Sequence, residues 1–163
     1  MRKNKNILFL TEGAMIAALY AALTLVTGQF AVSVIQLRLS EALTVLPVFL
    51  PSAVPGLAVG CLAANLLSFC SPVDTLVGTL VTLIAAVLTR RLRKKPVLAV
   101  LPPVILNAAI LPLIFRYVYH WEGTYLFFFG TVFLSEAMTA GVLGLFLFRV
   151  LDRYRNRPFS KMR

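Results

Sequence analysis

Charged residues are scarce in this chain, and acidic residues most of all. Only 13% of the 163 residues are charged, with just 6 Asp and Glu, whereas 60% are hydrophobic. Soluble domains carry about a quarter charged residues, so this composition excludes an ordinary soluble domain. It predicts an integral membrane protein.

The sequence also lacks the motifs of nucleotide hydrolysis and of common hydrolases. GxxxxGK[ST], HExxH and GxSxG are all missing, so the chain by itself has no phosphate-binding loop for ATP. His120, the single histidine, has no nearby nucleophile, and Cys61 and Cys70 do not follow a metal-ligand spacing. We therefore expect no catalytic residues, no metal site and no cofactor.

Basic residues outnumber acidic ones by 16 to 6, and their positions are informative. They gather near the N-terminus, in the RRLRKK run at residues 90–95, and from residue 149 onward. Each cluster borders an apolar segment, which is the positive-inside pattern of membrane proteins. This pattern favours a membrane role over nucleic-acid binding and predicts that all three clusters, with both termini, face the cytoplasm.

The apolar segments between these clusters predict six spans. We expect them at about residues 11–27, 41–50, 55–69, 75–92, 97–118 and 125–151, and the second is short and contains Pro47. Five spans would send one basic cluster to the outside, against the positive-inside rule. The prediction is a single all-α domain over residues 1–163, built as a six-transmembrane-helix bundle in the cell membrane.

Residues 35–47, IQLRLSEALTVLP, place Gln36, Arg38 and Glu41 in an otherwise apolar sequence. A charge in hydrocarbon costs about 2.5–3.5 kcal/mol on insertion scales, so such residues usually face a protein interior or a watery cavity. Arg38 and Glu41 are three residues apart, and a helical turn puts them on one face. They form either a recognition site or a salt bridge that holds a loop.

Other polar residues lie within the predicted spans or at their outer ends. Asn107 and Glu136 either contact a ligand or hydrogen-bond neighbouring helices. Asp74 either caps a helix or joins the site, and Trp121 belongs to an interfacial aromatic belt or stacks on a planar ligand. The candidate cavity, open to the outside, is lined by Gln36, Arg38, Glu41, Asn65, Asp74, Asn107, Trp121 and Glu136.

Small residues recur every four positions in the first span, at Ala14, Ala18 and Ala22. Such a stripe lets another helix approach closely. It packs either against the protein's own helices or against a partner.

With these residues in view, the chain resembles the QueT family of substrate-binding S components of energy-coupling factor (ECF) transporters, over about residues 7–152. The most specific segment is residues 35–47, and residues 55–68, 72–86, 135–137 and the region of Asn107 support it. The resemblance implies a six-helix bundle that captures a queuosine precursor, a 7-deazaguanine, from outside. It also implies assembly with a transmembrane coupling protein and two ATPases, with the Ala14, Ala18 and Ala22 stripe contacting the coupling protein.

The chemistry of such a substrate suits these side chains. A guanine-like edge offers adjacent N–H donors, which one carboxylate accepts in a fork, and either Glu41 or Glu136 is the expected acceptor. Asn107 or Gln36 would read the carbonyl, while Arg38 would orient Glu41. The alternatives are an S component for another small vitamin-like solute, a structural membrane protein without transport, and an ion-driven carrier. A carrier is disfavoured because the two halves show no convincing repeat.

Overall fold

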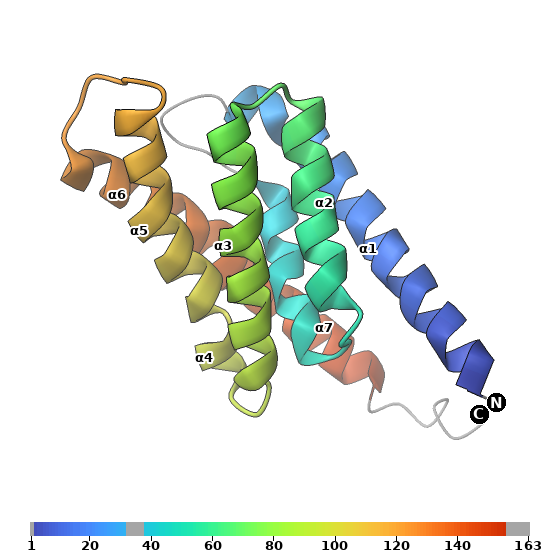
Figure 1. The fold of residues 1–163 in the computed structure, drawn as a ribbon. Coiled ribbons are helices and arrows are strands. Elements are labelled where there is room, and N and C mark those ends of the chain that lie inside the picture. Colours follow the sequence, from blue (N-terminus) through green and yellow to red (C-terminus); the bar gives the residue numbers. More distant parts are fainter. Residues whose placement is uncertain (1, 32–37, 156–163) are drawn as a thin grey trace.

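The computed structural model describes residues 2–31 and 38–155. Within these ranges the chain is helical and contains no strand (Figure 1). Four helices are long and apolar enough to cross a membrane: Asn4–Thr27, Pro72–Arg91, Pro96–Tyr117 and Tyr125–Tyr154. Two shorter apolar helices, Leu39–Val48 and Ala53–Leu67, complete the set. The predicted class, an all-α multi-pass membrane protein, is confirmed.

The helices follow the expected order, with different ends and helix types. The elements are α1 (Arg2–Ala31), the 3₁₀ helix η1 (Leu39–Val48), α2 (Ala53–Leu67), α3 (Pro72–Arg91), α4 (Pro96–Ala99), α5 (Leu101–Tyr117), α6 (Tyr125–Glu136), the π-helical η2 (Ala137–Leu143) and α7 (Gly144–Arg155). The first helix extends beyond the expected residues 11–27 at both ends. The short second segment is a 3₁₀ helix with Pro47 inside it.

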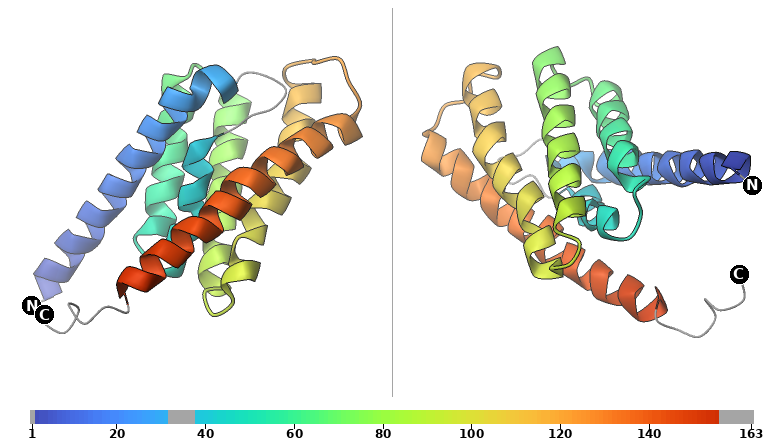
Figure 2. Two further views of the ribbon diagram at one scale, coloured as in Figure 1. Left: turned by 180° about the vertical axis from the view of Figure 1, so that it is seen from behind. Right: turned by 60° about the horizontal axis from the view of Figure 1, so that its bottom comes forward.

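The connections alternate between the two ends of the bundle. The start of α1, the turn between α3 and α4 and the end of α7 lie at one end, and the α2–α3 and α5–α6 connections lie at the other (Figures 1 and 2). We call the first the basic end, because the RRLRKK run lies there, and the second the opposite end. The basic residues of the α3–α4 turn therefore share one side with the start of α1, as the charge pattern predicts.

The 3₁₀ helix η1 lies in the interior of the bundle. It contacts α1, α2, α3, α7 and η2, and Glu41, Val45 and Pro47 on it are almost fully buried. Because η1 lies inside the protein, its carboxylate is surrounded by other helices and not by lipid. The Glu41 carboxylate must therefore find its partners inside the protein.

Helices α1 and α2 approach each other closely at glycine. A Cβ atom added at Gly60 would lie 2.8 Å from the carbonyl oxygen of Ala17, and one added at Gly56 would lie 2.7 Å from that of Gly13. Only glycine allows the two backbones to come this close. The internal contact of α1 therefore uses Gly13 and Ala17, whereas Ala14, Ala18 and Ala22 remain exposed on α1.

Candidate substrate-binding site

Two carboxylates lie inside the bundle. Glu41 on η1 is 2% exposed, and Glu136 at the end of α6 is 4% exposed. The Tyr20 hydroxyl on α1 donates a hydrogen bond of 2.5 Å to Glu41 Oε1. The Asn107 side-chain amide on α5 donates one of 2.8 Å to Glu136 Oε1. Each carboxylate is thus held by a side chain from a different helix.

Electrostatic interactions connect these groups. Glu136 interacts with both Glu41 and Arg38, and Arg38 interacts with Glu41 and Asp74. The charges carried by η1, α3, α6 and the segment before η1 therefore act on one another, and the shared cavity stays a prediction. Gln36, which was predicted to join them, lies outside the described residues.

Three buried polar atoms in this part of the protein lack a hydrogen-bond partner within the described ranges. They are Arg38 Nε, Thr75 Oγ1 and Glu136 Oε2. An unsatisfied buried polar group costs about 1–3 kcal/mol, and more when it is charged, so native proteins contain few of them. One donor, one acceptor and one hydroxyl are therefore the candidate contacts for a polar ligand.

Asp74 joins the α2–α3 turn to the α5–α6 connection at the opposite end. Its carboxylate accepts a hydrogen bond of 2.9 Å from the Tyr119 hydroxyl, which accepts one of 3.2 Å from the Ser71 backbone N–H. Burial is the main cause that raises the pKa of Tyr119, so this phenol stays protonated as the donor. The interpretation of Asp74 as a helix cap is wrong, because the cap of α3 is Ser71, whose hydroxyl accepts from the Asp74 N–H.

Trp121 belongs to an aromatic group at the same end. Its ring stacks on Phe115 with centroids 5.0 Å apart, and Tyr119 and Phe128 lie 5.9 Å and 6.2 Å away. The α5–α6 connection folds back on α5 through a hydrogen bond from the Trp121 backbone N–H to the Phe115 carbonyl. Trp121 therefore packs against α5 and α6 beside Tyr119, the hydrogen-bond partner of Asp74.

Asn65 has contacts of another kind. Its amide nitrogen lies 3.6 Å from Cys61 Sγ on the same helix, and a Cβ added at Gly78 of α3 would lie 3.2 Å from it. The Thr82 hydroxyl also donates to Cys61 Sγ, at 3.3 Å. These contacts place Asn65 between α2 and α3, and the hydrogen bond from Thr82 to Cys61 joins the two helices.

The predicted site does not include Tyr20, Thr75 and Tyr119, although the aromatic pattern at the outer end also drew attention to Tyr119. Tyr20 is 1% exposed and interrupts an alanine-rich span, a visible but unspecific signal. Thr75 follows Asp74 directly, yet hydroxyl residues are common in membrane helices. The role of Tyr119 depends on a partner 45 residues away, so no local pattern identifies it.

The backbone changes helix type next to Glu136. The π-helical segment η2 begins at Ala137, directly after that carboxylate. Short π segments inside α-helices occur frequently at functional sites. This irregularity lies beside the carboxylate whose buried Oε2 has no partner in the part of the chain that the structure describes.

Comparison with known proteins identifies the family of this chain. The profile of the family described as QueT transporter matches residues 10–153. A protein of Lactococcus lactis subsp. cremoris (strain MG1363) named Queuosine precursor transporter QueT is 40% identical over 86 residues, which is 52% of this chain and 50% of that protein. The chain thus matches about half the length of this relative, and no solved structure matches. Because the family profile covers most of the sequence, the chain belongs to the QueT transporter family.

Proposed function

We propose that this protein is the substrate-binding S component of an ECF-type importer, and that it captures a queuosine precursor from outside the cell. Two findings support this function: membership of the QueT transporter family, and buried polar atoms, among them Glu136 Oε2 and Arg38 Nε, that have no hydrogen-bond partner among the described residues. The relative's printed name refers to a queuosine precursor, and we carry that substrate over to this chain as part of the proposal.

Glu136 is the acceptor for the guanine-like edge in this proposal. Its Oε1 is occupied by Asn107, whereas its Oε2 is buried and has no partner within the described residues. A ring N–H or the exocyclic amine of a 7-deazaguanine would donate to Oε2. Asn107 then positions Glu136, and Glu41, already bonded to Tyr20, contributes negative potential.

Arg38 takes a direct role in binding. Its Nε is buried without a partner in the described part of the chain, and the carbonyl oxygen of the base would accept from it. Thr75 offers a hydroxyl on the α3 side of the site. Asp74, Trp121, Asn65 and Gln36 complete the proposed lining, with Asp74 and Trp121 at the outer end.

The orientation follows from charge. The basic end of the bundle faces the cytoplasm in this proposal, and the opposite end, with Asp74 and Trp121, faces outside. The chain lacks a GxxxxGK[ST] motif, so ATP would be used by two separate ATPases. The exposed stripe of Ala14, Ala18 and Ala22 would contact the transmembrane coupling protein that joins them.

A purely structural role is less consistent with the site. Polar residues that only join helices should be paired with one another, whereas Glu136 Oε2 and Arg38 Nε are not, within the described ranges. The free atoms favour a protein that receives a polar ligand.

Direct binding tests the proposal. Purified protein is titrated with queuine and with the aminomethyl and cyano forms of 7-deazaguanine, and biotin and riboflavin serve as unrelated vitamins. We expect saturable binding of at least one 7-deazaguanine and none of the two controls. Binding of a control alone would assign the protein to another solute, and binding of nothing would argue against a capture role.

A further inference from the structure

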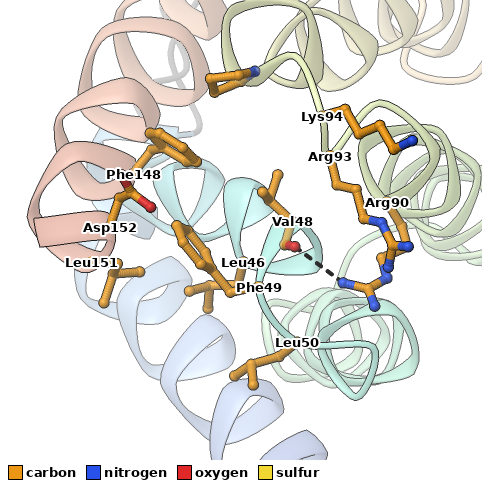
Figure 3. A pocket seen from close by; sticks show the side chains of 11 residues that line it. Leu46, Val48, Phe49, Leu50, Arg90, Arg93, Lys94, Phe148, Leu151 and Asp152 are labelled. Atoms are coloured by element: carbon orange, nitrogen blue, oxygen red, sulfur yellow. Dashed lines mark hydrogen bonds between the residues drawn. The ribbon is translucent and has the colours of Figure 1, made fainter. Parts of the chain in front are cut away.

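A cavity lies at the basic end of the bundle, and neither Glu41 nor Glu136 is among the residues that line it. Its volume is about 770 Å³, within the range of roughly 300–1,000 Å³ common for ligand sites. It opens between the ends of η1, α3 and α7 (Figure 3). Nothing in the proposed capture of a 7-deazaguanine uses it.

One wall of this cavity is basic. Arg90, Arg93 and Lys94 line it, and Figure 3 shows all three on the same side. Arg90 is held in place because its Nη1 donates to the carbonyls of Pro47 and Val48, at 2.9 Å and 3.1 Å. The charge of Arg93 acts unfavourably on Arg90, so the two guanidinium groups repel each other. An anion between them would relieve that repulsion.

The other wall is apolar. Leu46, Phe49, Phe148 and Leu151 line it, and the rings of Phe49 and Phe148 lie 5.2 Å apart. One carboxylate, Asp152, lies beside Phe148 across from the cations (Figure 3). The lining thus carries three cations and one carboxylate, which favours a ligand with a negative head and a hydrophobic body.

The geometry points to a binding site for an anionic phospholipid, with its phosphate against Arg90, Arg93 and Lys94 and an acyl chain against Phe49, Phe148 and Leu151. Basic pockets between membrane helices bind anionic headgroups on the cytoplasmic side, where such lipids are concentrated. A free phosphate has the same charge chemistry but would leave the aromatic wall unused. The apolar wall therefore favours the lipid.

Two double variants of the same turn test this site. Arg93→Gln with Lys94→Gln removes two charges from the cavity wall, and neither residue anchors η1 as Arg90 does. Arg91→Gln with Lys95→Gln removes two charges from the same turn, at exposed residues that are not among those lining the cavity. The matched pair separates a defined site from the overall charge of the surface.

Native mass spectrometry of the full chain measures retained lipid in micelles that contain phosphatidylglycerol or phosphatidylcholine. We expect the unmodified protein and the Arg91/Lys95 variant to retain phosphatidylglycerol in preference to phosphatidylcholine. The Arg93/Lys94 variant should bind phosphatidylglycerol roughly thirtyfold more weakly, since each basic residue near an anionic headgroup contributes about 1 kcal/mol. Phe148→Ala should also weaken binding, because the acyl chain loses an aromatic side chain that it packs against.

Three results would overturn the site. Equal losses in the two double variants would reduce the effect to surface charge. Equal retention of the two lipids would remove the role of the anion. Competition by inorganic phosphate at concentrations similar to those of the lipid, with no effect of Phe148→Ala, would assign the cavity to a free anion.

Discussion

Tyr20 on α1 donates a hydrogen bond of 2.5 Å to Glu41 on η1. This contact joins the first helix of the bundle to the buried 3₁₀ helix. The helix that carries Tyr20 also carries the exposed alanine stripe. The segment that carries Glu41 is the most specific part of the sequence. One hydrogen bond therefore links the helix of the stripe to the segment of Glu41.

Tyr20→Phe should destabilise the protein. The change leaves Glu41 Oε1 without its donor, and a hydrogen bond to a charged group contributes about 1.5–3 kcal/mol. Thermal unfolding in detergent should show a lower midpoint. Tyr117→Phe is the control, because Tyr117 is 67% exposed, and it should unfold like the unmodified protein. Equal midpoints for all three proteins would mean that the Tyr20 bond contributes no net stability.

Glu136→Gln should weaken binding of a 7-deazaguanine about tenfold to a hundredfold, the equivalent of about 1.5–3 kcal/mol. Gln can still accept from Asn107, so the helices should remain joined while the charge is lost. Glu41→Gln should have a smaller effect on affinity, since Glu41 is already bonded to Tyr20. Calorimetric titration measures both.

The exposed Glu122 provides the control for this comparison, and Glu122→Gln should bind normally. If Glu136→Gln and Glu41→Gln both bind as tightly as the unmodified protein, neither carboxylate reads the base. Recognition would then pass to Arg38, Asn107 and Gln36, or the ligand is another solute.

Cysteine labelling tests the orientation. Cysteines placed at Arg93 and at Arg153 should react only with reagent supplied from the cytoplasm, and one at Glu122 only from outside. Gly123 is a poor position because its φ is +153° and an added Cβ would lie 2.9 Å from the Phe128 ring. The half-buried Cys70 is first replaced by Ser to remove background. External labelling at Arg93 would reverse the proposed topology.

Ala18→Trp should separate binding from uptake. Ala18 is exposed and away from the α1–α2 contact, so the bundle can fold around a larger side chain. A partner that packs closely on the stripe has no room for it. We expect normal solute affinity with loss of uptake and of co-purification with the ATPases. Leu19→Trp, at the next exposed residue, projects about 100° further round the helix and should keep uptake.

Full uptake by a stable Ala18→Trp protein would show that no partner packs on the stripe. Equal losses of uptake in Ala18→Trp and Leu19→Trp would show that the whole exposed surface of α1, and not the stripe, is required.

Gly60→Ala should destabilise the bundle by about 1–3 kcal/mol, because its Cβ would meet the Ala17 backbone at 2.8 Å. Gly130→Ala is the matched control, since an added Cβ there meets nothing within 4 Å. Alanine is the better helix former by about 1 kcal/mol, so this control should be neutral or slightly stabilising. Thermal unfolding measures both variants. Equal midpoints would mean that the contact between α1 and α2 accommodates the added methyl group without loss of stability.

Composition and periodicity by themselves determined much of this protein. Scarce charge and long apolar segments predict a helical membrane protein, because hydrocarbon tolerates few ions and requires backbone groups to be bonded within each helix. The three basic clusters predict which ends lie together. The isolated positions of Arg38, Glu41 and Glu136 predict a polar interior, since such residues are too costly to leave in lipid.

Only the tertiary structure decided which groups are paired. Tyr20 and Glu41, Asn107 and Glu136, and Asp74 and Tyr119 are separated by 21, 29 and 45 residues. Residues this far apart meet through helix packing, and a local pattern carries no information about the helix that lies opposite. The glycine contact between α1 and α2 likewise selects Gly13 and Ala17 as the internal face of α1. Packing of this kind left the alanine stripe outside, and left one oxygen of Glu136 without a partner among the described residues.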